Sequence, residues 1–315
     1  MVKKMKRYLN KIVILSLVLF AQVFISCGAK WTNDFEEAKK LSAKKKQPIL
    51  LFLNSGDTAA LDFKANFLDT REFISAAGKN FVLLSLDAVT EEEQKVDEIL
   101  SLVADYSVKE ILPLIIINKD GYYVGRIEKA EKIETVKELT EQLLLATPDF
   151  NKVEELSALI NASKGTDKVR AIDELFEYTD ENCRRPLHAL CEQVLAEDAG
   201  NITGLLGKYE LQIVFDQVYD MLTPVTVDEA AERFVSLAKT GHLDNSQKFE
   251  AYYYAAYLYP LVGSYDYDKM LELLNLSYSV DPSNPNSQEI AIAIQTIESM
   301  KDYNEFSSQT EVAPE

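Results

Sequence analysis

Four short apolar runs, all between residues 48 and 127, divide this chain of 315 residues into two unlike parts. Each run has the length and apolar character of a buried or half-buried strand; they are Pro48–Leu53, Phe81–Asp87, Leu114–Asn118 and Tyr122–Ile127. From Thr147-Pro148 onward no comparable run occurs, and the pattern is helical. A chain of this length holds about two domains. The pattern therefore predicts an α/β domain over residues 27–147 and an all-helical domain over residues 148–303.

Helical signals between the runs complete the order of the first part. Asn33-Asp34-Phe35-Glu36 is typical of a helix start, because an Asp side chain accepts hydrogen bonds from the first free backbone N–H groups. Further helices are predicted over 61–74, with a break near Asp69-Thr70, over 91–106 and over Glu131–Ala146. Lys119-Asp120-Gly121 predicts a hairpin turn. The resulting order, helix–strand–helix–strand–helix–strand–strand–helix, indicates an α/β sandwich.

Residues 1–26 have the pattern of an export signal. They contain five basic residues and no acidic residue, and an apolar run from Ile12 to Ile25 follows the basic start. This run is shorter than the about 20 residues that a helix needs to span a bilayer, and an uncleaved membrane anchor is the alternative interpretation.

The end of this segment refines the prediction. Phe24-Ile25-Ser26-Cys27 resembles the bacterial lipoprotein box, with Phe in the position where Leu is usual. The resemblance implies that 1–26 is a lipoprotein signal peptide and that Cys27 is diacylated. We therefore expect a lipid-anchored protein of the cell envelope, on the periplasmic side or the outer surface of a bacterial membrane. Its acyl chains would anchor it firmly, because each buried CH₂ contributes about 0.8 kcal/mol.

Residues 31–147 resemble the thioredoxin-like domains of exported bacterial proteins. The motifs that carry the resemblance are Lys46-Gln47-Pro48-Ile49-Leu50-Leu51-Phe52, Ala60-Leu61-Asp62-Phe63-Lys64-Ala65-Asn66-Phe67-Leu68-Asp69-Thr70-Arg71-Glu72-Phe73, and Leu112-Pro113-Leu114-Ile115-Ile116-Ile117. The resemblance implies a thioredoxin-like sandwich in which the peptide bond before Pro113 is cis. It also implies a groove in which extended peptide lies, for which the candidate residues are Asp57, Thr58, Leu112 and Pro113.

The chain departs from this family at the redox motif. The family's Cys-x-x-Cys aligns with Asp57-Thr58-Ala59-Ala60, and no cysteine lies between Cys27 and Cys183. Thiol–disulfide exchange requires a thiolate, so we expect a redox-inactive domain without a catalytic residue. Asp57 is then either an acid–base group at a helix N-terminus or an N-cap, and the cap is the interpretation we favour because no neighbouring His or second carboxylate completes a catalytic set.

The second part predicts a helical-repeat domain followed by a disordered tail over 304–315. Helices are predicted near 149–163, 167–180, 185–198, 202–221, 226–240, 246–261, 266–280 and 286–303. Tyr267-Asp268-Lys269-Met270 and Asp281-Pro282-Ser283-Asn284 resemble the start and end of the second helix of a tetratricopeptide (TPR) repeat, although Met270 stands where Ala is usual. The resemblance implies an all-α, TPR-like domain.

Tyrosines crowd residues 252–278 of this part. Tyr combines apolar contact area with a polar tip and suits partner surfaces, which makes Tyr253, Tyr254, Tyr257 and Tyr267 candidates for partner binding. The alternative is packing between helices. Three consecutive tyrosines cannot all face one core, so at least one of Tyr252, Tyr253 and Tyr254 is expected to point outward.

Charge and metal-ligand content exclude several functions. Residues 148–315 hold 12 basic and 30 acidic residues, and the whole chain has a net charge of −18, which argues against nucleic-acid binding. Cys183, His188 and Cys191 lie close in sequence, but a zinc site usually needs four ligands, so we predict no metal and no cofactor. We expect a protein-binding or chaperone-like scaffold whose partner is a protein or peptide. The alternative is a thioredoxin-family thiol–disulfide oxidoreductase.

Overall fold

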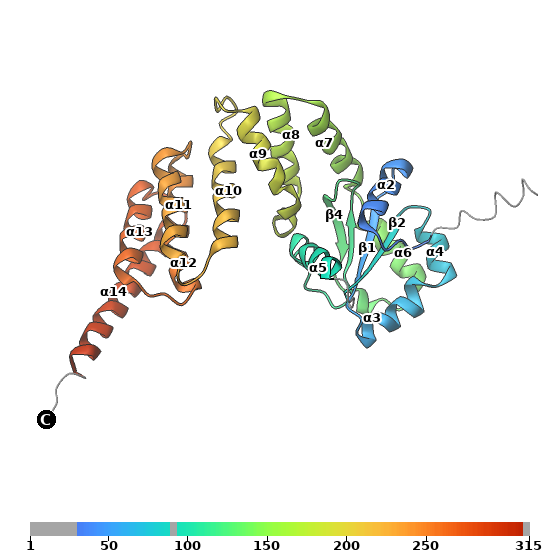
Figure 1. Cartoon of the computed structure of the whole chain (residues 1–315), viewed down its shortest axis with the longest axis horizontal. Coiled ribbons are helices and arrows are strands. Elements are labelled where there is room, and N and C mark those ends of the chain that lie inside the picture. The colour runs from blue at the N-terminus through green and yellow to red at the C-terminus, as the bar shows by residue number, and fades with distance from the viewer. Residues whose placement is uncertain (1–29, 89–92, 311–315) are drawn as a thin grey trace, which may run out of the picture. The chain divides into compact units, whose positions relative to one another are not determined.

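The computed structural model describes residues 30–88 and 93–310, so Cys27 and the predicted signal peptide lie outside the described part (Figure 1). The chain forms two compact units. The first comprises the described residues up to Ala158 together with Leu175–Pro186, and the second comprises Leu159–Glu174 and the chain from Leu187 onward. The border therefore passes through helices α7 (Phe150–Ala162) and α8 (Gly165–Tyr178), whereas the sequence placed it at residue 147.

The first unit contains a mixed sheet of four strands. These are β1 (Ile49–Asn54), β2 (Val82–Asp87), β3 (Leu114–Ile117) and β4 (Tyr123–Ile127), each within one residue of its predicted bounds. Their order in the sheet is β2-β1-β3-β4. β1 pairs in parallel with β2 and antiparallel with β3, and β3 pairs antiparallel with β4. All six residues of β1 are buried, as expected for a central apolar strand.

Helices cover both faces of this sheet. They are α2 (Phe35–Lys45), α3 (Thr58–Phe63), α4 (Arg71–Ala77), α5 (Glu93–Asp105) and α6 (Val136–Leu145), with a π-helical segment over Lys64–Leu68. Alternate strand residues such as Leu51 and Ile115 share a core cluster with Ala38 of α2 and Leu102 of α5. On the other face, the ring of Phe52 lies 6.4 Å from that of Phe63 in α3, and α6 contacts α4 and β4.

Side-chain caps set the helix starts, and one predicted start is wrong. Asp34 accepts a hydrogen bond from Glu37 N–H at 2.7 Å, and Thr70 accepts one from Phe73 N–H at 3.2 Å, which places the break where the sequence predicted it. The predicted helix over 131–146 instead begins at Val136. Ala130–Lys132 forms a separate 3-10 turn, because Thr135 caps α6 by accepting from Glu138 N–H at 3.1 Å.

After residue 148, the described part of the chain contains helices joined by turns and no strand, as predicted. After α7 and α8 come α9 (His188–Glu197), α10 (Leu206–Met221), α11 (Val227–Thr240), α12 (Asn245–Leu261), α13 (Tyr267–Val280) and α14 (Ser287–Thr310), and 3-10 turns span Glu181–Cys183 and Arg185–Leu187. From α9 to α14 each helix packs against the next (Figure 1). α14 continues to Thr310, beyond the predicted start of the disordered tail.

The core of the second unit is continuous across α10 to α14. Phe234 of α11, Phe249 of α12 and Leu274 of α13 are buried in one cluster. Asp244 and Gln247 form a reciprocal capping box at the start of α12. Ser277 is buried and donates a hydrogen bond to the carbonyl of Phe249 at 2.7 Å, which ties α13 to α12.

Candidate functional site

The strand register brings the two predicted groove segments to one edge of the sheet. Phe52, near the end of β1, pairs with Leu114, the first residue of β3. Asp57-Thr58 follows β1 and Leu112-Pro113 precedes β3, so both segments lie beyond this edge. Asp57 and Thr58 are exposed, whereas Leu112 and Pro113 are buried. Of the four candidate groove residues, the accessible ones are therefore Asp57 and Thr58 at the start of α3, and not Leu112 and Pro113.

Asp57 is the N-cap of α3, which confirms the favoured interpretation. One carboxylate oxygen accepts the Ala60 N–H at 2.8 Å, and the other accepts the Ser55 hydroxyl at 2.8 Å. The hydrogen bond from Ala60, followed by that from Ser55, lowers the pKa of Asp57. A carboxylate held in its ionised form by these donors satisfies the free backbone groups of the helix and is a poor general acid near neutral pH.

The Leu112–Pro113 peptide bond is trans, so the expectation of a cis bond is wrong. For a bond before proline the trans form is favoured by about 0.5–1 kcal/mol unless the surrounding chain imposes the cis form. Leu112 lies in a bend, and Pro113 leads directly into β3. The side chains of both residues pack inside the unit and offer no surface to a partner.

The described cysteines are distant in sequence from the start of α3 and unsuited to redox chemistry. Cys183 and Cys191 are both free and buried. Burial raises the pKa of Cys183, although Arg126 opposes this effect, and burial raises the pKa of Cys191 to about 12. A thiol exchanges only as its thiolate, so neither residue is an activated nucleophile.

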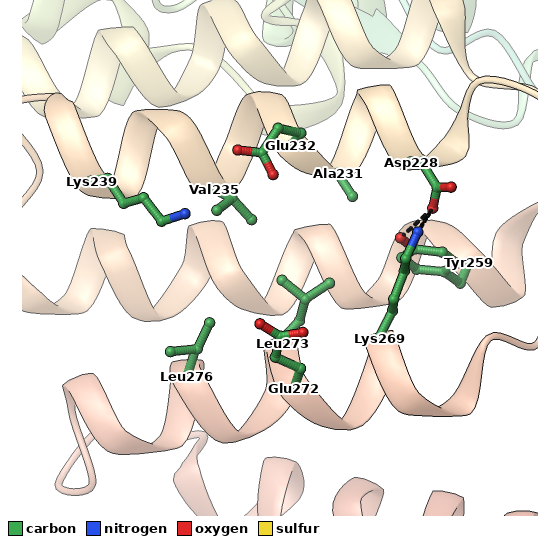
Figure 2. A pocket seen from close by; sticks show the side chains of 10 residues that line it. All are labelled: Asp228, Ala231, Glu232, Val235, Lys239, Tyr259, Lys269, Glu272, Leu273 and Leu276. Atoms are coloured by element: carbon green, nitrogen blue, oxygen red, sulfur yellow. Dashed lines mark hydrogen bonds and ion pairs between the residues drawn. The ribbon is translucent and has the colours of Figure 1, made fainter.

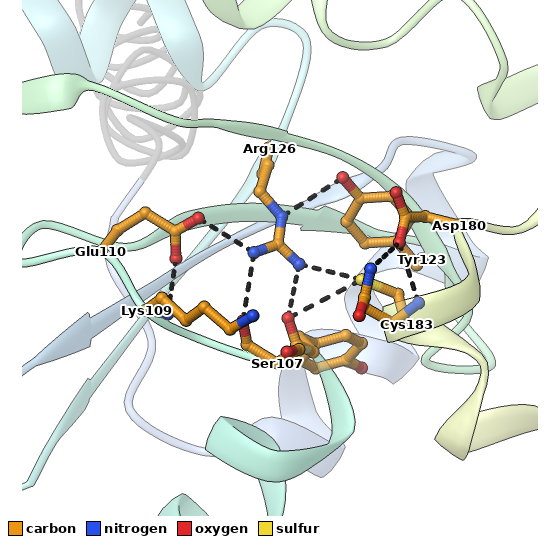
Figure 3. Close-up of polar contacts among 9 residues, drawn as sticks. Ser107, Lys109, Glu110, Tyr123, Arg126, Asp180 and Cys183 are labelled. Carbon is orange, nitrogen blue, oxygen red and sulfur yellow. Dashed lines mark hydrogen bonds and ion pairs between the residues drawn. The ribbon is translucent and has the colours of Figure 1, made fainter. Parts of the chain in front are cut away.

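Cys183 belongs instead to a polar cluster around Arg126 of β4 (Figure 3). The guanidinium group donates to Cys183 Sγ at 2.8 Å, to Glu110 Oε1 at 2.9 Å and to the Tyr123 hydroxyl at 3.3 Å. It also donates to the carbonyl of Tyr106. These bonds satisfy most donors of a side chain that is 14% exposed, and they hold the turn that contains Cys183 against the sheet. This cluster is structural.

The predicted tyrosine surface is only partly exposed. Tyr253, Tyr254 and Tyr267 are half-buried and pack against the core of the second unit. Tyr254 meets the ring of Phe215 edge-on at 5.5 Å. Tyr257 is 49% exposed and stacks on Tyr253 at 6.0 Å. Of the four candidates, Tyr257 therefore offers the largest accessible ring.

A groove runs between α11 and α13, both of which pack against α12 (Figure 2). Its cavity has a volume of about 190 Å³. Its apolar lining consists of Ala231, Val235, Leu273 and Leu276. Charged side chains from both bordering helices reach its rims, and they are Asp228, Glu232 and Lys239 from α11 and Lys269 and Glu272 from α13. The structure thus places an apolar floor between two rims that both carry charged side chains.

One end of the groove is closed by a bonded triad. Asp228 accepts a hydrogen bond from Lys269 Nζ at 2.6 Å and another from the Tyr259 hydroxyl at 2.8 Å (Figure 2). The bond from Lys269, with that from Tyr259, lowers the pKa of Asp228. These contacts join α11, α12 and α13, so the triad fixes the spacing of the helices that border the groove.

The residues that line the groove were not predicted from the sequence as site residues. Their spacing was a usable signal, because 228, 232, 235 and 239 fall on one face of a helix, as do 269, 272, 273 and 276. Each set mixes apolar and charged residues on that face, which is typical of a half-buried helix surface. Which two faces would meet could not be deduced from spacing alone.

The described residues offer no metal site and no membrane helix. No three His, Cys, Asp or Glu side chains among them lie close enough together to hold a metal ion. His188 is paired with Asp216, its Nδ1 lying 2.9 Å from Oδ2. Within the same residues, no helix has the length and apolar character needed to cross a membrane.

Comparisons with known proteins show similarities over different parts of the chain. Residues 205–303 match a family model described as "Uncharacterised protein C-terminal domain". The chain is 22% identical, over 276 residues, to a protein of Treponema pallidum (strain Nichols) named "Uncharacterized protein", and the match covers 85% of this chain and 88% of that protein. The solved structure of "DsbH Oxidoreductase" is 20% identical with a TM-score of 0.34, and the match covers 38% of this chain and 85% of that one.

Proposed function

We propose that this chain is a lipid-anchored protein of the cell envelope that binds other proteins. In this proposal a thioredoxin-like sheet domain without redox activity is joined to a TPR-like helical domain. The order of strands and helices observed in the first unit supports the thioredoxin-like part. The succession of neighbouring packed helices in the second unit supports the TPR-like part.

The observation that carries the proposal is the capped start of α3. At the position where the family has its Cys-x-x-Cys, Asp57 is engaged as an N-cap, and Ala60 is buried beneath it. Without a thiolate there, no disulfide can be attacked and no mixed disulfide can form. What remains at this edge of the sheet is an exposed surface that includes Thr58 and Ile111, which is 62% exposed. Such a surface suits contact with another protein.

An insulin-reduction assay separates this proposal from the oxidoreductase alternative. The protein from residue 27 onward is compared with its Cys183→Ser/Cys191→Ser variant in the presence of dithiothreitol. We expect equal rates, because neither buried thiol is activated. Turnover above that of the double variant would establish the oxidoreductase function.

Protein binding is tested in membranes. Cells producing the wild-type chain are treated with a membrane-permeable cross-linker, and the adducts are identified by mass spectrometry. The Cys27→Ala variant is the control for anchoring. We expect a specific set of envelope proteins with the wild type; recovery of no protein above the background of an unrelated lipoprotein would refute the proposal.

A further inference from the structure

The groove between α11 and α13 has room for a side chain rather than for a small molecule. Its volume of about 190 Å³ lies below the about 300–1,000 Å³ that is usual for small-molecule sites. The floor beneath it is apolar, because Val235 and Leu273 are buried and Leu276 is half-buried. Binding is favoured when the aliphatic stem of a long side chain lies on such a floor, because the stem is then removed from water.

Two carboxylates face this floor from opposite rims. Glu232 projects from α11 and Glu272 from α13, and both are exposed (Figure 2). Glu232 accepts a hydrogen bond from the Ser236 hydroxyl at 3.3 Å, and within residues 30–88 and 93–310 no Lys or Arg forms an ion pair with either carboxylate. The nearby ammonium of Lys269 is bonded to Asp228. The middle of the groove therefore has one carboxylate on each side, and neither of them is in an ion pair with a described Lys or Arg.

The ends of the groove limit what fits. The Asp228–Lys269–Tyr259 triad closes one end, and Lys239 stands toward the other (Figure 2). The lining contains three carboxylates (Asp228, Glu232 and Glu272) and two ammonium groups (Lys239 and Lys269), so one further positive charge neutralises it. The acidic surplus of residues 148–315, with 30 acidic against 12 basic residues, attracts a basic segment over a longer range.

We propose that this groove binds a peptide segment of a partner protein through one Arg or Lys side chain flanked by apolar residues. The cationic head lies between Glu232 and Glu272, and the stem and the flanking residues contact Val235, Leu273 and Leu276. This inference rests on the proposed protein-binding function and specifies the chemistry of the partner. Arg fits best, because its planar guanidinium donates to carboxylates on two sides.

The test is fluorescence anisotropy with the full chain in detergent. The probe is a short fluorescein-labelled peptide in which one arginine lies between two leucines in a glycine–serine background. A matched peptide carries glutamine in place of arginine. We expect the arginine peptide to bind about five- to tenfold more tightly, since exposed ion pairs contribute up to about fivefold each. The preference decreases as salt rises.

A matched pair of variants localises the effect. Glu232→Gln/Glu272→Gln removes the two groove carboxylates and is expected to abolish the preference for arginine. Glu229→Gln/Glu298→Gln changes the net charge equally at exposed positions outside the groove and is expected to retain it. All four positions are exposed, and thermal unfolding followed by circular dichroism checks that both variants are folded.

Two outcomes would overturn the inference. One is equal binding of the arginine and glutamine peptides to the wild-type chain, and the other is an equal loss of preference in both double variants. If either occurs while cross-linking in membranes still recovers partner proteins, the groove assignment fails and the proposed function stands. If cross-linking recovers none, the proposed function itself fails.

Discussion

Replacing Arg126 tests how the turn that contains Cys183 is held to the sheet unit. Arg126→Met removes a planar cation that donates to Glu110, Cys183 and the carbonyl of Tyr106. Met is an unbranched, apolar side chain of a size similar to that of Arg, so the substitution changes the side-chain volume little. The main consequence is a carboxylate, Glu110, that is only 14% exposed and has lost its counter-ion.

The expected cost follows from this orphaned charge. Removing one partner of a buried ion pair costs about 3–5 kcal/mol, and the residual exposure places this case near about 3 kcal/mol. Glu110→Gln in the Arg126→Met background removes the orphaned charge and should restore about 1–2 kcal/mol, so the two substitutions should be strongly non-additive.

The pH dependence has a definite sign. Burial acts to raise the pKa of Glu110, but the hydrogen bonds from Arg126 and from the Lys109 N–H outweigh it and lower the pKa from its usual value. The folded pKa is thus depressed, so the pair stabilises the wild type above the unfolded pKa, and this stabilisation is lost as pH falls through the folded pKa. In Arg126→Met, burial raises the pKa of Glu110 without an opposing cation. Acidification should therefore protonate Glu110 readily and reduce the difference in free energy of unfolding between the variant and the wild type.

Urea unfolding followed by fluorescence measures the effect. Trp31, the one tryptophan of the chain, lies in the sheet unit, where its Nε1 donates to the carbonyl of Leu68 at 3.2 Å and its ring stacks on Phe73. The tryptophan fluorescence therefore reports on the sheet unit, whereas circular dichroism reports on the helices of both units together. A loss below about 1 kcal/mol for Arg126→Met, or additive effects in the double variant, would refute the assignment of the cluster as a buried charged anchor.

Four further outcomes are expected. Cys27→Ala should leave the membrane fraction on cell fractionation, and a variant that stays there would contradict lipidation at Cys27. Gly125→Ala should lose at least about 2 kcal/mol in urea unfolding, because the added Cβ would lie 2.1 Å from the carbonyl oxygen of Ala146; a neutral result would mean that α6 shifts freely on β4. Thr135→Ala should lose about 1 kcal/mol with the cap of α6, whereas Thr135→Ser should keep it. Cys191 is buried and its pKa is raised to about 12, so it should resist iodoacetamide at pH 8 in the folded chain, and mass spectrometry of native and urea-unfolded samples checks this.

Much of the first unit could be predicted because its signals are local. The strands are short apolar runs between polar turns, and each was predicted within one residue. The helix break at Thr70 and the cap at Asp57 each depend on a side chain that accepts a hydrogen bond from a backbone N–H three residues later. Both partners therefore lie within one short segment, where the sequence pattern reveals them. The helix over 131–146 was predicted too long because an earlier start has the same apolar periodicity, and only the cap at Thr135 decides between them.

Accessibility at the candidate sites was not predictable in the same way. Leu112 and Pro113 occupy the expected edge of the sheet but are buried, and the bond between them is trans. Among the tyrosines, Tyr257 points outward while Tyr254 packs against aromatic rings of α10 and α11. These outcomes depend on which helix packs on which, and that is a property of contacts between distant segments.

By itself the sequence determined that the start of α3 has no thiol, that the first unit contains an α/β sheet and that the second consists of helices. These features depend on residue identity and on short-range periodicity, which any folded arrangement of the chain must respect. Only the tertiary structure decided that Glu232 and Glu272 face each other over an apolar floor. They belong to separate helices, and the packing of α11 and α13 against α12 brings their faces together.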